Sequence, residues 1–406
     1  MSSEKFIKNN TALVTLIAAC GVVLISLGVR QTFGLFFTDF KNDLNISITQ
    51  SGLAIGLQML VWGLTGPIFG VLADKYGGHK AISLAFVFYI LGIYFLYSGP
   101  NTGIFFQMHL GILVGIGLGG TAISIPMAVV GKHFPLSNRT IAMSIVTAVG
   151  SFGYFISPLY TSYSLVNNGW TNTLFVFAIV LAFGFVISFF VRSPSLTQSI
   201  EKPNDQSTLN ALKEAFKTKS YLLLTAGFFV CGFHITLVGT HIPTYVVDRG
   251  LEGWTAATIL SLIGLFNIFG SLLSGYLSIK MSKKIILSLI YLLRGVSICF
   301  FIFLPPSNIG AFIFGASFGF LWLSTVPATS GIVAQMFGTK YLGLLYGIVF
   351  LSHQVGSFFG AYLGGLFHDL YGSYDYAWYL AIALSLLAGI IHLPIKEKPV
   401  LRLQTE

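Results

Sequence analysis

Residues 11–37 read TALVTLIAACGVVLISLGVRQTFGLFF, and this stretch decides the class of the fold. A bilayer core needs roughly 20 apolar residues in a helix, so the stretch is long enough to cross a membrane. It is longer than the apolar region of a signal peptide, which has about 7–15 residues, and it shows no small-residue cleavage site. We therefore interpret it as the first transmembrane helix.

One residue in this helix is unexpected. Arg30 is a permanent cation in the segment Leu27-Gly-Val-Arg-Gln-Thr-Phe-Gly-Leu-Phe-Phe37, which is otherwise apolar. A guanidinium at membrane depth costs at least about 2.5 kcal/mol by insertion scales. The remaining chain must therefore supply a partner, or the partner is a ligand.

The whole chain has the composition of a membrane protein. Its 406 residues are 55% hydrophobic and 9% charged, with a mean hydropathy of +0.83, whereas soluble chains carry about 25% charged residues. Apolar runs long enough to span recur twelve times. They lie approximately at 11–37, 48–72, 80–99, 103–130, 138–162, 170–192, 220–247, 254–279, 284–304, 308–336, 340–367 and 375–395. The sequence predicts an all-α integral membrane protein with 12 transmembrane helices.

The long polar connection at 193–219 divides these spans into two sets of six. We expect a six-helix bundle at 1–192, a cytoplasmic linker at 193–219, whose Leu209–Lys217 part forms an amphipathic helix, and a second bundle at 220–406. The bundles share sequence, since Val149-Gly-Ser-Phe152 recurs as Val355-Gly-Ser-Phe358. Two pseudo-symmetric six-helix repeats are typical of a secondary transporter with its site between the halves.

Charge fixes the expected topology. On the side of the N terminus we count 18 basic residues, and only Lys41 and Arg249 fall on the other side. The positive-inside rule then predicts that both termini are cytoplasmic. We expect the chain to lie in the plasma (inner) membrane. The same asymmetry accounts for the net charge of +9, so no nucleic-acid partner is implied. The cysteines, Cys20, Cys231 and Cys299, lie in apolar runs without metal-ligand spacing, and we expect no metal, cofactor or disulfide.

The loop after the second span reads Gly70-Val-Leu-Ala-Asp-Lys-Tyr-Gly-Gly-His-Lys80. It resembles the signature loop of the major facilitator superfamily, which implies the fold of two six-helix bundles that alternate between inward- and outward-facing states. The resemblance assigns gate contacts to Gly70, Asp74, Gly77 and Lys80. The alternative is a tight charged cytoplasmic turn without a gating role.

Within the superfamily the chain looks most like the monocarboxylate and oxalate transporter-like branch. The entry to the fifth span carries His133-Phe134, Arg139 and Ala148-x-Gly150-Ser-x-Gly153, similar to that branch. The resemblance places a substrate-binding lysine of eukaryotic members within a residue of Arg30 or Gln31. It also shows a departure, because the arginine of the eighth span is replaced, at its expected position, by Ser271.

Every acidic residue falls in a loop, a tail or a helix end, so the apolar interior holds Arg30 and Arg294 and no carboxylate. An anionic substrate is one partner for Arg30; backbone carbonyls are the other. For Arg294, on a helix that is peripheral in the superfamily, we expect structural bonds. The expected substrate-binding residues are Arg30, Gln31, Gln58, Asn267, Trp322, His353 and Gln354.

Histidine titrates near neutral pH, so His234, His241 and His353 are candidates for proton coupling; neutral histidines that fix helix contacts are the alternative. The predicted function is uptake of a small organic anion, a monocarboxylate, by proton symport. The alternative is a transporter of a neutral or aromatic metabolite or vitamin, followed by a membrane sensor or an efflux pump. No enzyme is predicted. The expected partners are the substrate, lipid and protons, and the chain is expected to be a monomer.

Overall fold

The computed structural model describes residues 3–193, 207–338, 340–400 and 403, and its regular structure over these ranges is helical throughout. It contains 11 continuous helical stretches long and apolar enough to cross a membrane. One of them belongs to α8 (Leu136–Ser188), whose 53 residues bend at Gly169, where φ is 77°. At about 1.5 Å per residue α8 is much longer than one bilayer crossing, so it contains two spans. The predicted all-helical membrane fold is confirmed.

The elements follow the apolar runs of the sequence closely. The first half of the chain contains α1 (Ser3–Gln31), η1 (Phe33–Phe36), α2 (Phe37–Leu44), α3 (Ile48–Tyr76), α4 (Gly78–Ser98), α5 (Ile104–Phe106), η2 (Gln107–Leu113), α6 (Val114–Thr121), α7 (Ser124–His133) and α8. The second half contains α9 (Thr208–Lys217), α10 (Lys219–Asp248), α11 (Gly253–Lys280), α12 (Lys283–Phe303), α13 (Asn308–Leu321), α14 (Thr325–Phe337), α15 (Leu342–Tyr371) and α16 (Asp375–His392). The expected linker lies partly outside the described residues; within it, α9 buries Ala211 and Ala215.

Two crossings are interrupted at matching places in the two halves. In the first half, α6 ends at Thr121 and α7 begins at Ser124, two residues before Pro126. In the second half, α13 ends at Leu321 and α14 begins at Thr325, two residues before Pro327. Proline lacks an N–H and crowds the carbonyl four residues earlier, so it weakens the preceding turn of a helix. These breaks free backbone carbonyls at mid-membrane depth, which other groups must satisfy.

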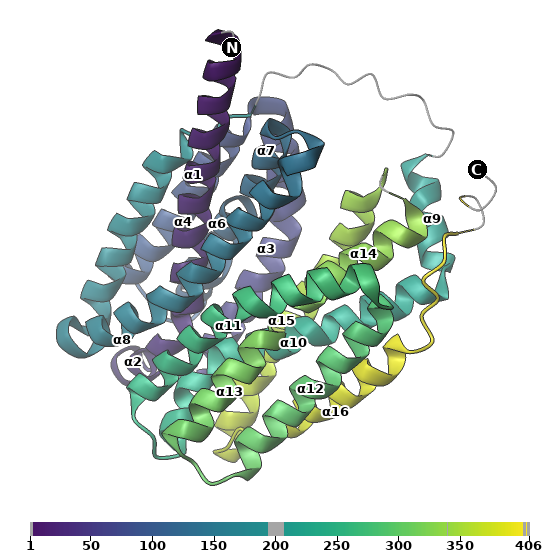
Figure 1. Cartoon of the computed structure of the whole chain (residues 1–406). Helices are drawn as coiled ribbons and strands as arrows, with labels where there is room; N and C mark the ends of the chain where they lie inside the picture. The colour runs from purple at the N-terminus through teal and green to yellow at the C-terminus, as the bar shows by residue number, and fades with distance from the viewer. Residues whose placement is uncertain (1–2, 194–206, 339, 401–402, 404–406) are drawn as a thin grey trace.

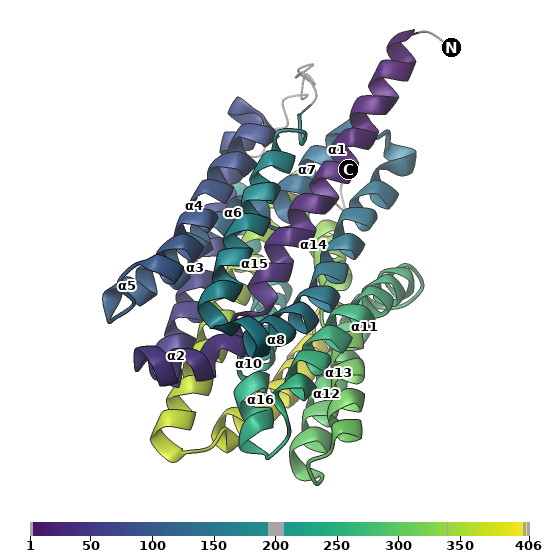
Figure 2. The same cartoon turned by 90° about the vertical axis from the view of Figure 1, so that its left-hand side faces the viewer.

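The helices form two groups. In the first, α1 packs on α8 and α4 on α6; in the second, α10 packs on α15 and α12 on α16 (Figures 1 and 2). The groups meet through α3 against α15 and α8 against α11. We call the end of the molecule where α1 begins and α16 ends the terminal side, and the opposite end the distal side (Figure 1).

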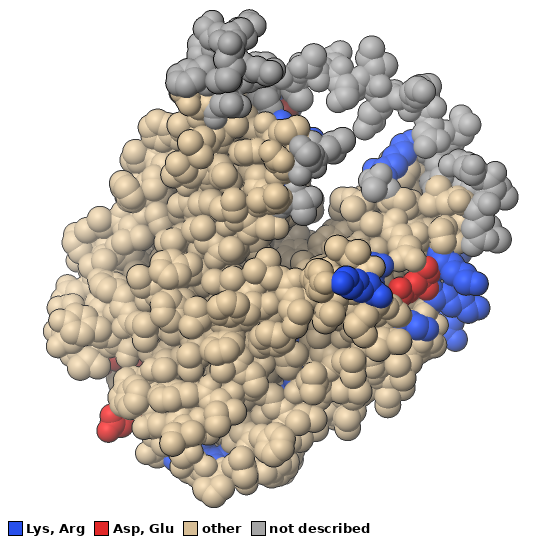
Figure 3. Space-filling view, in the orientation of Figure 1, with Lys and Arg blue, Asp and Glu red and all other residues tan. Residues whose placement is uncertain are grey.

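On the distal side the two groups touch backbone to backbone. A Cβ atom at Gly52 of α3 would lie 2.3 Å from the carbonyl oxygen of Ala361 in α15, and one at Gly365 would lie 2.5 Å from that of Ile48. Glycine permits this approach because it has no side chain. On the terminal side the space-filling view is hollowed between the groups (Figure 3). The structure is therefore closed distally and open toward the terminal side.

Candidate functional site

Arg30 lies in the last turn of α1, just before η1. Its side chain is buried, with 8% of its surface exposed. Nη1 donates to Oε1 of Gln31 at 3.2 Å, and Nη2 donates to the sulfur of Met59 in α3 at 3.2 Å. Both partners are neutral, and a thioether sulfur is a weak acceptor. Among the described residues, no carboxylate forms an ion pair with this guanidinium.

Two buried tyrosines lie close to Arg30, and one of them, Tyr154, is within hydrogen-bonding range of the guanidinium. Tyr89 of α4 donates its hydroxyl to the carbonyl of Ser26 at 3.1 Å, and Tyr154 of α8 is 5% exposed. A phenol is neutral at physiological pH, so neither tyrosine compensates the charge of Arg30. Neither tyrosine was predicted from the sequence as a site residue. The signal for Tyr154 was its place directly after Gly153, in the glycine motif of the fifth span.

Met59 is the point where the two helix groups meet around Arg30. Its sulfur accepts from Arg30, and its carbonyl oxygen accepts from Nε2 of Gln354 in α15 at 3.0 Å. Oε1 of Gln354 is 3.0 Å from Nδ1 of His353, whose ring stacks on Phe350. The structure thus brings together four of the predicted residues, Arg30, Gln31, His353 and Gln354; we call these four and Met59 the Arg30 cluster.

Trp322 lies next to this cluster across α10. A Cβ atom at Gly239 would be 3.5 Å from Cη2 of Trp322 and 4.0 Å from Nε2 of Gln31. The tryptophan is 1% exposed, and Nε2 of Gln31 is buried without a hydrogen-bond partner in the described structure. An amide donor is therefore available beside Arg30, against an aromatic wall.

The other two predicted amides have different surroundings. Both polar atoms of the Asn267 amide form hydrogen bonds: Nδ2 donates to Oγ of Ser151 at 2.9 Å, and Oδ1 accepts from the backbone N–H of Leu323 at 3.0 Å. It ties α11 to α8 and to the helix break before α14. Gln58 donates from Nε2 to the carbonyl of Leu110 at 3.0 Å, and its Oε1 is buried without a partner in the described part of the chain. Within the described structure, no hydrogen bond joins the side chain of either residue to the Arg30 cluster.

Two of the three candidate proton carriers make contacts inside the second half. His234 contacts the carbonyl of Ala381 at 2.8 Å through Nε2, and His241 contacts that of Ala361 at 2.7 Å through Nε2. Both side chains are fully buried, and a ring N–H that bonds a carbonyl holds neighbouring helices together. His353 is the candidate that lies in the Arg30 cluster.

The comparisons with known proteins agree with this architecture. The sequence profile described as Major Facilitator Superfamily matches residues 19–326, which is most of the chain. The chain belongs to the major facilitator superfamily. It is a multi-pass membrane transporter, and its relatives are transporters rather than enzymes.

The relatives within the superfamily are distant and cover the whole fold. The chain is 25% identical to the uncharacterized MFS-type transporter YcxA of Bacillus subtilis, over 91% of each chain. It is 24% identical to monocarboxylate transporter 13 of Rattus norvegicus, over 89% of this chain and 83% of the relative. It is 24% identical to the sialic acid transporter NanX of Escherichia coli, over 86% and 85%. Among solved structures, a bacterial homolog to the human lysosomal transporter Spinster, in an inward-facing and unoccupied conformation, matches with a TM-score of 0.72, 15% identity and coverage of 95% and 98%.

The superfamily signature loop joins α3 to α4 on the terminal side. Asp74 pairs with Lys132 of α7 at 2.6 Å, between exposed side chains within the first half. Gly77 has φ of 94°, a backbone conformation that favours glycine, and it both ends α3 and begins α4. Gly70 leaves room for a Cβ atom, and Lys80 lies in the first turn of α4. In this state, therefore, the acid pairs with Lys132 rather than Lys80.

Arg294, the second interior cation, donates to backbone carbonyls that the helix break before α14 leaves free. Its Nε and Nη2 donate to the carbonyl of Leu321 at 3.2 and 2.7 Å, and Nη2 also reaches the carbonyl of Trp322. The guanidinium lies 5.4 Å from the ring centre of Tyr291. These are the bonds to a neighbouring helix that a structural role would need, although Nη1 is buried without a hydrogen-bond partner in the described structure.

Proposed function

We propose that the protein transports a small organic anion of the monocarboxylate class, by proton-coupled uptake, with Arg30 as the anion-binding residue. The observation that carries the proposal is that Arg30 is buried and that its partners among the described residues, Gln31, the sulfur of Met59 and Tyr154, are all neutral. A buried cation without a counter-charge is costly, and a bound carboxylate would remove that cost. A carboxylate can also form a bidentate, charge-assisted pair of hydrogen bonds with arginine, and this interaction is stronger than the bond to the thioether sulfur.

The neighbouring groups suit a carboxylate. Nε2 of Gln31 has no partner in the described structure and can donate to a carboxylate oxygen. Gln354, from the second half, donates to the carbonyl of Met59, whose sulfur contacts Arg30, so a ligand held between Arg30 and Gln354 would bridge the two helix groups. Such a bridge is what alternating access requires, because the ligand must engage both halves.

Proton coupling is assigned to His353 in this proposal. It lies in the Arg30 cluster, its Nδ1 faces Gln354, and an imidazole can take up and release a proton. A proton on His353 would add a second positive charge beside the anion, so proton and anion would favour each other's binding. The relatives named as monocarboxylate and sialic acid transporters support an acidic substrate, because both substrate classes carry a carboxyl group.

A neutral metabolite is the second candidate, and the unpartnered amide atoms favour it. Nε2 of Gln31 and Oε1 of Gln58 are both buried without partners, offering one donor and one acceptor. Ser271, at the position where the branch has an arginine, bonds back to the carbonyl of Asn267 at 2.8 Å and brings no charge. A neutral polar substrate would use these groups and would not need Arg30.

The test is flux of labelled lactate into proteoliposomes, with and without an inward proton gradient. We expect gradient-stimulated uptake, competed by other monocarboxylates and not by neutral solutes. Arg30→Gln should weaken binding about 10- to 100-fold, the value of a charge-assisted hydrogen bond. Lys41→Gln, which removes an exposed distal cation, is the matched control and should retain flux. Competition by neutral solutes alone, with unchanged flux in Arg30→Gln, would favour the second candidate.

A further inference from the structure

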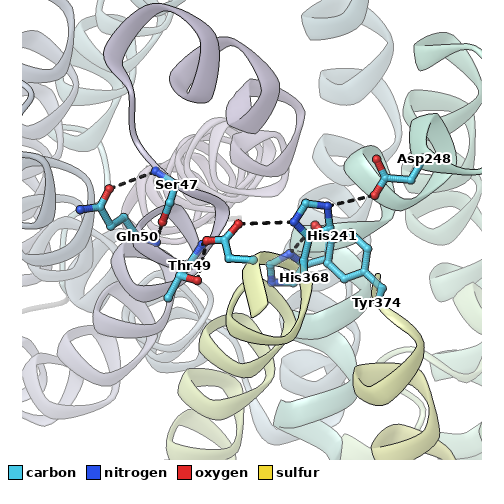
Figure 4. Close-up of polar contacts among 8 residues, drawn as sticks. Ser47, Thr49, Gln50, His241, Asp248, His368 and Tyr374 are labelled. Atoms are coloured by element: carbon cyan, nitrogen blue, oxygen red, sulfur yellow. Dashed lines mark hydrogen bonds and ion pairs between the residues drawn. The ribbon is translucent and has the colours of Figure 1, made fainter. Parts of the chain in front are cut away.

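A chain of four side chains joins the two helix groups on the distal side (Figure 4). Nε2 of His368 in α15 lies 3.2 Å from Oδ2 of Asp248 at the end of α10, and Nδ1 lies 3.4 Å from Oδ1 of Asp369. The other oxygen of Asp369 accepts from the backbone N–H and the hydroxyl of Thr49 in α3, at 2.7 and 2.6 Å. We call these four residues the distal latch.

The geometry around His368 favours a protonated ring. Both ring nitrogens face carboxylate oxygens, and carboxylates only accept. A neutral imidazole has one N–H and can serve one of them, whereas the imidazolium ion serves both. The His368 side chain is 12% exposed, so water does not readily replace the missing donor. The arrangement therefore fits the charged ring.

Among the described residues that contact His368 or its carboxylate partners, no lysine or arginine competes for those carboxylates. Tyr374 lies with its ring centre 4.7 Å from that of His368, and its hydroxyl is 3.3 Å from Nδ1 of His241. From α10, His241 is held by the carbonyl of Ala361, and α3 contributes the uncharged Thr49. Arg249, next to Asp248 in sequence, bonds instead to Tyr245 and to two carbonyls, those of Ile302 and Leu304.

Asp369 closes the distal side by binding the start of α3. Ser47 is the N-cap of this helix and forms a capping box with Gln50, which leaves the N–H of Thr49 for Asp369. A carboxylate at a helix N-terminus is favoured by the helix dipole and by the free amides. Because Asp369 and Thr49 belong to different halves, opening the distal side must break these bonds.

We propose that His368 is a proton-binding site that controls opening of the distal side. With the proton bound, the imidazolium holds Asp248 and Asp369 together and orients Asp369 toward Thr49. When the proton leaves, the neutral ring can donate to only one of the two carboxylates, and the negative charges of Asp248 and Asp369 are no longer compensated, which favours opening. The latch is therefore complete at acidic pH and is lost as pH rises through the titration of the imidazole, so acid favours the distal-closed state.

The proposal requires alternating access and no particular substrate, so it stands apart from the role of Arg30. It can be tested without substrate by measuring distances between spin labels at Lys41→Cys and Glu252→Cys, two exposed distal positions in different halves. The background replaces Cys20, Cys231 and Cys299 with Ala. In nanodiscs, the ratio of closed to open populations should fall about fivefold or more between pH 5.5 and 8.5.

Three variants decide the outcome. His368→Gln should remove the pH dependence and give the high-pH distribution throughout. His109→Gln is the matched control: this distal histidine pairs with Asn101 inside the first half and should leave the pH shift unchanged. A pH shift retained in His368→Gln, or absent in the unmodified protein, would overturn the proposal. If His368→Gln does not fold, Asp248→Asn, which leaves the ring one carboxylate, must reduce the shift.

Discussion

At the scale of single residues, we predict that replacing the two buried arginines has different effects on the free energy of unfolding. Arg294 donates to the carbonyls of Leu321 and Trp322, so Arg294→Met leaves them without these donors and should cost about 2–4 kcal/mol of unfolding free energy. Arg30 has weak neutral partners, so Arg30→Met should change stability by less than about 1 kcal/mol or increase it. Denaturant titration in detergent measures both. Equal losses in the two variants would contradict the assignment of Arg30 as a ligand-binding cation.

Polar residues in an apolar run could be assigned to the candidate site from the sequence, as Arg30, His353 and Gln354 were. Met59 and Tyr154 could not, because an apolar or aromatic residue in a span is indistinguishable from packing until its neighbours are known. Asn267 and His234 were predicted as site residues from the same polarity, yet the groups they bond are Ser151, a backbone N–H and a backbone carbonyl. Sequence cannot show partners of this kind.

At the scale of elements, glycines set how closely α3 and α15 approach. Gly365→Ala would place a methyl group 2.5 Å from the carbonyl oxygen of Ile48, a contact that the backbone must relieve by moving apart. We expect this variant to shift the population toward the distal-open state, measured with the same spin-label pair. Gly347→Ala, in the same helix, meets nothing within 4 Å and is the matched control. An unchanged distribution in Gly365→Ala would mean that this contact does not limit distal opening.

The positions of the helices were predictable because a bilayer requires long apolar runs, and each run from Thr11 to 395 contains an observed crossing. The interruptions were less predictable. Pro126 and Pro327 are visible in the sequence, but the break lies in the turn before each proline and depends on what satisfies the freed carbonyls. The π-helical segment η2 has no proline to mark it. Local irregularity in a membrane helix thus depends on tertiary partners that hydropathy does not report.

At the scale of the whole molecule, the charge asymmetry predicts which compartment the hollow faces. Lys75 is exposed on the terminal side and Lys41 on the distal side, and basic residues of the chain concentrate on the former. Since positively charged loops remain in the cytoplasm, the terminal side should be cytoplasmic and this structure inward-facing. In a background without native cysteines, Lys41→Cys should react with an impermeant maleimide in intact cells, whereas Lys75→Cys should react only after permeabilisation. The reverse pattern would place the distal latch on the cytoplasmic side, and the proton that closes it would then come from inside the cell.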